Sequence, residues 1–323
     1  MRVTKHNARG MKGSSQGFSA KHNDRNYDIS KADNINVEMS KYNRYLSVKN
    51  GKWYSEAEKD RYKTFEEVEQ EYYEKHFKHQ WEEQQKRHKQ KRNYNRMKPF
   101  EEWCRNKMYC PEESFIQVGN IDNHISNKLM FKIGREYVRA HQDYCKEHHI
   151  KCSIIDVSFH FDEAVPQMHL RRVWYSVKDG KRYIGQNDSL DNSDLQLPYP
   201  DKKPGKNNNK KMTFDSDLRE ILLDICERNG LEVEREPQEG VEHNLSKKGY
   251  LAKKSRELEK ENRQLSEENG RLKNEVLQNE NMILLEAERI KKAREQSQQN
   301  RIQQAQELED SITENPQKSA FSL

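Results

Sequence analysis

A heptad repeat of leucine near the carboxyl end constrains the fold of this chain more than any other feature. Leucine recurs at every seventh position, at Leu251, Leu258, Leu265 and Leu272. The alternate core positions hold Ser255, Asn262, Asn269, Val276 and Ile283. This is the pattern of a parallel leucine zipper, in which buried asparagines cost stability and fix the register. Beyond Leu272 the apolar stripe shifts, which indicates a stutter. We expect a self-associating coiled coil over residues 251–310, with a solvated single helix as the alternative, and a disordered tail over 311–323.

The composition limits the classes of protein to which the chain can belong. Of its 323 residues, 35% are charged and 32% are hydrophobic, which is too polar for one core spanning the whole length. No apolar run approaches the ~18 residues of a membrane span, and the amino-terminal residues lack the apolar stretch of a secretory signal. Five cysteines without a CxxC pair suit free thiols. We expect a cytoplasmic protein without a membrane span, and the net charge of +5 does not by itself indicate nucleic acid.

The rest of the chain divides by composition into three zones. Residues 1–50 are rich in Asn, Ser and Lys, whereas residues 51–112 are dense in charge and predict a mostly solvated helical insertion. Residues 113–250 contain the only globular pattern, that of an α+β domain on an antiparallel sheet. Its expected elements are strands over 115–119, 152–161, 168–177 and 231–234, helices over 128–148 and 215–228, a hairpin turn at 179–180 and a long loop over 186–211.

Two histidines and a glutamine are the candidate metal ligands. Gln167 and His169 are two residues apart, so on a strand they point to the same face, and the intervening Met168 points to the core. His160 ends the preceding strand, and a short connection brings it back beside His169. Two imidazoles and an amide oxygen suit Mn²⁺ or Mg²⁺, with Glu163 as a base or an acceptor for a ligand's proton. As bare residues, histidines at this spacing are more often ordinary surface or core residues.

Two motifs carry a resemblance to a known family. Residues 160–170, HFDEAVPQMHL, resemble the HxDE…PHxH motif of plasmid mobilisation and recombination (Pre/Mob) proteins, the MobV relaxases, which are His-hydrophobic-His (HUH) endonucleases. Residues 22–25, HNDR, match the HNxR motif of that family, and residues 40–46, SKYNRYL, match the segment that carries its NYxL motif. The resemblance covers roughly residues 5–250.

The resemblance implies an HUH-type palm domain that cleaves one DNA strand at a transfer origin, for plasmid or mobile-element mobilisation or recombination. His22 is then the nucleophile, and His160 and His169 hold the divalent metal. Gln167 replaces the first histidine of the PHxH pair; its amide oxygen can still bind Mg²⁺ or Mn²⁺, but affinity should fall. Residues 1–50 then carry the nucleophile motif, and residues 113–250 form the metal-binding part.

The implied chemistry is physically consistent. A divalent cation neutralises the phosphodiester, and a neutral imidazole can attack phosphorus. The product joins His22 to the DNA 5′ end and leaves a free 3′ hydroxyl, so the reverse attack rejoins the strand without ATP. Glu163 would orient the His22 proton, and Arg25 would pair with a phosphate.

The sequence offers other candidate nucleophiles besides His22 and several candidate DNA contacts. Tyrosine serves many HUH enzymes, so the rivals of His22 are Tyr27, Tyr42, Tyr45 and His6. Basic, aromatic and amide side chains are the candidate DNA contacts: Arg171, Arg172, Trp174, Asn43 and the lysines at 202, 203, 206, 210 and 211. The expected partners are single-stranded or supercoiled DNA and a second copy of the chain. The alternative functions are an HUH replication initiator and a catalytically inactive DNA-binding or scaffold protein.

Overall fold

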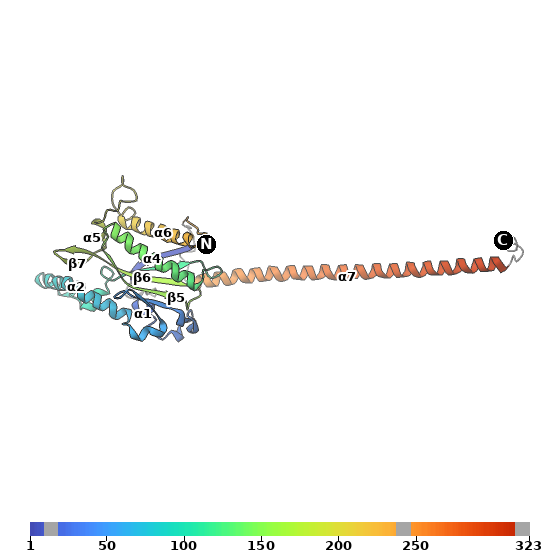
Figure 1. Cartoon of the computed structure of the whole chain (residues 1–323), viewed down its shortest axis with the longest axis horizontal. Coiled ribbons are helices and arrows are strands. Elements are labelled where there is room, and N and C mark those ends of the chain that lie inside the picture. The colour runs from blue at the N-terminus through green and yellow to red at the C-terminus, as the bar shows by residue number, and fades with distance from the viewer. Residues whose placement is uncertain (10–18, 237–246, 314–323) are drawn as a thin grey trace. The chain divides into compact units, whose positions relative to one another are not determined.

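A computed structural model describes residues 1–9, 19–236 and 247–313. The chain forms two compact units, Met1–Pro237 and Gln238–Leu323. The first unit is an α+β domain built on a seven-stranded antiparallel sheet, as the sequence predicts (Figure 1). The second contains a long helix.

The sheet brings together strands from distant parts of the first unit. Its strands are β1 (Val3–Arg9), β2 (Arg44–Ser47), β3 (Lys52–Ser55), β4 (Glu112–Val118), β5 (Cys152–His160), β6 (Gln167–Lys178) and β7 (Lys181–Ile184). Their order is β1-β4-β6-β5-β2-β3, and β7 pairs with the far end of β6. The β6–β7 turn contains Asp179 and Gly180, both at positive φ (50° and 75°), as a tight hairpin turn of this kind requires. The three central strands β4, β6 and β5 therefore form the frame to which the remaining strands attach.

One face of the sheet is covered by the helices α4 (Asn127–Glu147) and α6 (Lys210–Arg228). Apolar side chains of β5 and β6, such as Phe159 and Met168, are fully buried there against α4. Burying one such side chain contributes about 1.5–3 kcal/mol. At Gly134 an added Cβ would lie 2.3 Å from the Phe159 ring, so a glycine is needed where α4 meets the sheet.

The opposite face carries α1 (Ala20–Asn23), α2 (Phe65–Gln90) and α3 (Phe100–Cys104). A capping box of Thr64 and Glu67 begins α2. Buried aromatic residues of α2 and α3, Tyr73, Phe77 and Trp103, pack with Ile155 and Val173 of the sheet. Short 3₁₀ helices complete the connections at Ile29–Lys31, Val37–Tyr42, Glu56–Arg61 and Tyr94–Arg96.

Several elements differ from the sequence prediction. The strand β1 was not predicted, because the polar side chains of Lys5 and Asn7 face α6, where both contact Asp215, and this removes the apolar alternation that marks a strand. The range 51–112, predicted as a helical insertion, also contributes β3. The predicted loop over 186–211 contains a short helix, α5 (Gln186–Asp191). Residues 231–234 form no strand, although the backbone N–H of Glu234 donates to the Met1 carbonyl at 3.0 Å.

The second unit contains the helix α7 (Lys247–Thr313), which covers the predicted coiled-coil range. The side chains of Leu258, Leu265 and Leu272 are 48–50% exposed in the single chain. The predicted tail over 311–323 lies outside the described residues from 314 onward. None of the helices in the described ranges combines the length and apolar character that a membrane crossing needs.

Candidate active site

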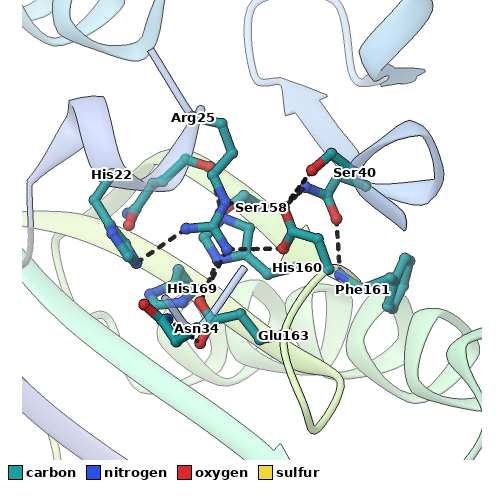
Figure 2. Close-up of polar contacts among 12 residues, drawn as sticks. His22, Arg25, Asn34, Ser40, Ser158, His160, Phe161, Glu163 and His169 are labelled. Atoms are coloured by element: carbon teal, nitrogen blue, oxygen red, sulfur yellow. Dashed lines mark hydrogen bonds and ion pairs between the residues drawn. The ribbon is translucent and has the colours of Figure 1, made fainter. Parts of the chain in front are cut away.

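Three histidines from separate parts of the chain meet on the α1 side of the sheet. His22 lies on α1, whose first turn is capped by the Ser19 hydroxyl, while His160 ends β5 and His169 lies on β6. The ring centroids of His160 and His169 are 4.5 Å apart, and the His22 ring lies 5.4 Å and 5.5 Å from them. One nitrogen of each ring lies within 4.8 Å of the others. The close-up in Figure 2 shows the three rings gathered at one place beside Arg25 and Glu163.

Hydrogen bonds determine which nitrogen of His160 and of His169 carries a proton. His160 Nε2 lies 2.9 Å from the Asn23 carbonyl oxygen, which can only accept, so Nε2 donates and Nδ1 keeps its lone pair. His169 Nδ1 lies 2.7 Å from Glu113 Oε1, so Nδ1 donates and Nε2 keeps its lone pair. Both lone-pair nitrogens are buried and have no hydrogen-bond partner among the described residues.

Two buried, unpaired imidazole lone pairs are the arrangement expected of metal ligands. A ligating histidine usually donates its other N–H to a carboxylate or a carbonyl, as both of these do. In addition, Glu163 Oε1 lies 3.7 Å from the lone pair of His160 Nδ1, which places two acceptors beside each other. A cation would be attracted to both, so the residues present fit a divalent metal.

Gln167 lies next to this pair in the sheet. It is opposite His160 on β5 and opposite Gln117 on β4, it is 6% exposed, and it shares the face of His169. It therefore lies on the same face of the sheet as His160 and His169, and its role as a third ligand stays a prediction.

Arg25 connects His22 to the loop after β5. Its backbone has a positive φ of 54°, and its side chain is buried. Its guanidinium donates to Asp162 at 2.8 Å and 3.1 Å and to Glu163 Oε1 at 2.8 Å. The remaining nitrogen, Nη1, lies 3.4 Å from His22 Nε2. Burial opposes ionisation of Glu163, yet the hydrogen bond and the positive charge of Arg25 hold the pKa of Glu163 well below its usual range.

Asp162 and Asn43 hold the loop that carries Glu163. Asp162 accepts hydrogen bonds from Arg25, from the Ser40 hydroxyl at 2.9 Å and from the Asn43 amide at 2.7 Å. The Asn43 oxygen in turn accepts from the Phe161 backbone N–H at 2.7 Å. Asn43 is fully buried with both ends of its amide engaged, so the expected DNA contact is wrong and the residue positions the loop instead.

A second set of charged residues surrounds Glu113, the carboxylate that accepts the hydrogen bond from His169. Arg171 is 6% exposed and donates to Glu113 at 3.2 Å and to Glu69 of α2 at 2.9 Å. Asn23 donates to the same carboxylate of Glu113 at 3.1 Å. Arg171 thus lies on the site face as the strand alternation predicts, but it is paired with carboxylates beneath the histidines.

Arg172 and Trp174 lie on the opposite face of the sheet. Arg172 is fully buried and donates to Glu112 at 2.7 Å, and the Trp174 indole N–H donates to the same carboxylate at 2.8 Å. Side chains alternate along a strand, so both point toward α4 and α6, away from His169. The expectation that they contact DNA is wrong, because both are core residues. In the lysine run, Lys211 pairs with the same Glu112 at 2.9 Å.

The environment of His22 differs from that of its rivals. Burial, with the nearby His169 and Arg25, lowers the pKa of His22 to about 4, so the ring is neutral at pH 7. Tyr45 is buried, and its hydroxyl donates to Glu56; burial raises its pKa well above the usual range. Tyr27 lies beside His22 with ring centroids 6.2 Å apart, and it remains the nearest rival. His6 is exposed on β1 and is not part of the three-histidine group.

Three supporting residues, Asn23, Glu113 and Asp162, were not assigned roles from the sequence. Asn23 and Asp162 lie inside the two motifs that were recognised, so their positions offered a signal. Glu113 had none, because only the pairing of β4 with β6 brings it beneath His169.

The sequence matches no protein-family model and no curated protein. Solved structures of the MobM relaxase domain (MOBV; Mob_Pre), Mn-bound and in complex with plasmid pMV158 oriT DNA, are similar. One, at pH 6.8, is 15% identical with a TM-score of 0.45 and matches 78% of this chain and 98% of its own. Another, at pH 4.6, is 16% identical with a TM-score of 0.44 and matches 78% of this chain and 100% of its own.

Proposed function

We propose that the chain is a metal-dependent relaxase that nicks and rejoins one DNA strand at a transfer origin through a covalent histidine–DNA intermediate. The observation that carries this proposal is the pair of buried lone pairs on His160 and His169, which lie beside a third, neutral imidazole on a separate helix. The sequence resemblance of both motifs to the MobV family supplies the substrate class.

In this proposal His160, His169 and Gln167 hold a divalent cation, Mn²⁺ or Mg²⁺. When bound, such a cation neutralises the non-bridging oxygens of the scissile phosphodiester. The His160 and His169 rings are oriented for this task by Asn23 and Glu113, which fix the tautomers.

His22 is the proposed nucleophile rather than a ligand. Its Nε2 faces a guanidinium N–H of Arg25, which can only donate, so Nε2 carries the lone pair and Nδ1 carries the proton. A metal ligand would instead donate to a carbonyl or carboxylate. In the reaction the Nε2 lone pair forms a bond to phosphorus while the bond to the 3′ oxygen breaks. That oxygen takes up a proton from water and leaves as a 3′ hydroxyl, which balances the proton that the imidazole loses from Nδ1. Glu163 accepts the proton from the imidazole or holds Arg25 in place.

The first test is the formation of a covalent adduct. Full-length protein is incubated with single-stranded oligonucleotides and Mn²⁺ and then run on a denaturing gel. We expect a slower protein–DNA band with the wild type and none with His22→Ala. His6→Ala is the matched control and should keep the band, because residues 5–9, KHNAR, repeat the KHNxR pattern of residues 21–25. An adduct that persists in His22→Ala and disappears in Tyr27→Phe would assign the chemistry to tyrosine and contradict the proposal.

A catalytically inactive DNA-binding protein is the second candidate, and Gln167 is the observation that favours it. An amide oxygen is a weaker ligand than an imidazole, so the metal affinity falls. The two candidates differ in one measurement: the inactive protein shifts labelled oligonucleotides on a native gel but forms no adduct at any Mn²⁺ concentration.

We also propose that α7 pairs with α7 of a second copy. A single chain leaves Leu258, Leu265 and Leu272 half exposed, and pairing at the heptad positions would bury them.

A further inference from the structure

A second cluster of reactive side chains lies on the other face of the sheet, apart from the three histidines. His141 and Cys145 belong to α4, and Cys152 is the first residue of β5. Ligand-type atoms of the three residues all lie within 4.8 Å of one another. His141 and Cys145 are buried, and Cys152 is partly exposed.

The turn between α4 and β5 brings the two cysteines together. His149 adopts a left-handed backbone conformation with φ of 57°, and the Ile150 backbone N–H donates to the Cys145 carbonyl at 2.8 Å. The chain therefore reverses at the end of the helix and returns beside it. Cys145 and Cys152 pack in the same apolar cluster, together with Trp174 and Phe214.

The charges around the cluster favour a thiolate and disfavour a metal ion. Arg172 Nη1 lies 3.2 Å from His141 Nε2 and can only donate, so the imidazole proton is on Nδ1. That Nδ1 lies 3.8 Å from Cys145 Sγ and donates to it. A metal bound to His141 Nδ1 would require the imidazole proton to be on Nε2. That N–H would then point at the N–H donors of the Arg172 guanidinium, which is unfavourable. The fixed positive charge of Arg172 would also repel a cation.

The two thiols are not equivalent. A hydrogen bond from the Cys152 thiol, followed by one from His141, lowers the pKa of Cys145 despite its burial. Burial raises the pKa of Cys152, and the neighbouring Cys145 raises it further. A thiolate beside a thiol is the arrangement from which disulfides form.

We propose that Cys145 and Cys152 are a modification site that reacts with peroxides to form a reversible disulfide. The Cys145 thiolate attacks one oxygen of hydrogen peroxide, the O–O bond breaks, and the other oxygen leaves as hydroxide, which gives a sulfenic acid. The hydroxide takes up the proton released when the Cys145 thiol ionised and becomes the first water. The Cys152 sulfur then attacks the sulfenic sulfur, the S–O bond breaks, and the Cys152 proton leaves with the hydroxide as a second water. Two thiols and one peroxide thus yield one disulfide and two waters, and a dithiol reductant reverses the reaction.

The disulfide would tie the last turn of α4 to the start of β5. His160 ends the same strand eight residues farther along, so the cross-link acts on the stability of the domain and not on the histidine site. The stabilisation by a disulfide grows with the length of the loop that it closes, and this loop is short. We therefore expect a modest rise of about 5 °C in the midpoint of thermal unfolding.

The test uses full-length protein treated with hydrogen peroxide, quenched with catalase, alkylated under denaturing conditions and mapped by mass spectrometry without reduction. We expect a cross-linked peptide pair joining Cys145 to Cys152, lost with dithiothreitol and absent in Cys145→Ser and Cys152→Ala. The control Cys226→Ser removes a buried thiol of the other apolar cluster and should keep the cross-link. A thermal melt of oxidised wild type and oxidised Cys152→Ala gives the second readout.

Three results would overturn the proposal. The first is sulfenic or sulfinic acid on Cys145 with no cross-link, and the second is a cross-link that involves Cys104 or Cys110 instead. The third is stoichiometric binding of Zn²⁺ that is lost in Cys152→Ala, which would make the cluster a metal site. None of these readouts depends on DNA cleavage, so they leave the proposed relaxase function untouched.

Discussion

Two adjacent buried glutamates on β4, Glu112 and Glu113, face opposite sides of the sheet. Comparing their variants separates an effect on the proposed metal site from an effect on the stability of the domain. Glu113 faces the histidines, and its Oε1 accepts a hydrogen bond from His169 Nδ1 at 2.7 Å. Glu112 faces the other way and pairs with Arg172 and Lys211 at 2.7 Å and 2.9 Å. Both carboxylates are at most 3% exposed. Replacing either by glutamine removes one buried negative charge and leaves a buried arginine with one partner fewer.

The two variants should differ sharply in metal binding. Loss of a carboxylate that orients a ligating histidine typically weakens metal affinity 10- to 100-fold, which corresponds to about 1.4–2.8 kcal/mol. We expect Glu113→Gln to weaken Mn²⁺ binding by this factor, because a neutral amide no longer holds the His169 proton in place. Glu112 contacts no residue of the proposed metal site, so Glu112→Gln should change the Mn²⁺ affinity less than threefold. Both variants should lower the melting temperature.

Isothermal titration calorimetry of the apo protein with MnCl₂ measures the affinity, and a thermal melt of each variant confirms folding. An unchanged affinity in Glu113→Gln, or equal losses in both variants, would refute the reasoning that His169 is a metal ligand oriented by Glu113.

Further predictions concern the ligand set, the loop after β5, acid stability and α7. Gln167→His should lower the Mn²⁺ concentration that gives half-maximal adduct, and an unchanged concentration would place Gln167 outside the ligand set. Asp162→Ala removes the partner of the buried Arg25 and should cost about 3–5 kcal/mol in urea unfolding; a loss below 1 kcal/mol would contradict the buried network. Despite burial, Arg172 and Lys211 hold the pKa of Glu112 below its unfolded value near 4.5, so its contribution is complete above that pH and falls as the pH drops. The melting-temperature gap between wild type and Glu112→Gln should therefore be widest at pH 7 and narrow below pH 4.5. Leu265→Asp should convert a dimer to a monomer in sedimentation velocity, whereas a monomeric wild type would exclude pairing through α7.

The strands of the site were predictable because their side chains follow a clear alternation. That alternation placed Met168 in the core and His169 on the site face, and the structure agrees. The same alternation places Arg172 and Trp174 in the core, but their charge and aromaticity suggested a DNA contact. The error shows that position on a strand determines burial more reliably than residue type when a buried carboxylate such as Glu112 is available as partner.

The parts that the sequence did not predict depend on long-range pairing. Glu113 becomes a partner of His169 only through the β4–β6 register, and β1 becomes a strand only because Asp215 of α6 receives its polar side chains. The proximity of Cys145 to Cys152 depends on the left-handed turn at His149. None of these contacts leaves a periodic pattern in the local sequence.

The central claim is tested most directly by locating the covalent bond. The purified protein–DNA adduct is digested with nuclease and protease, and the modified peptide is sequenced by mass spectrometry. We predict a nucleotide attached to His22 through an acid-labile phosphorus–nitrogen bond. A nucleotide on Tyr27 through an acid-stable bond, or an adduct on any residue outside the three-histidine site, would contradict the account.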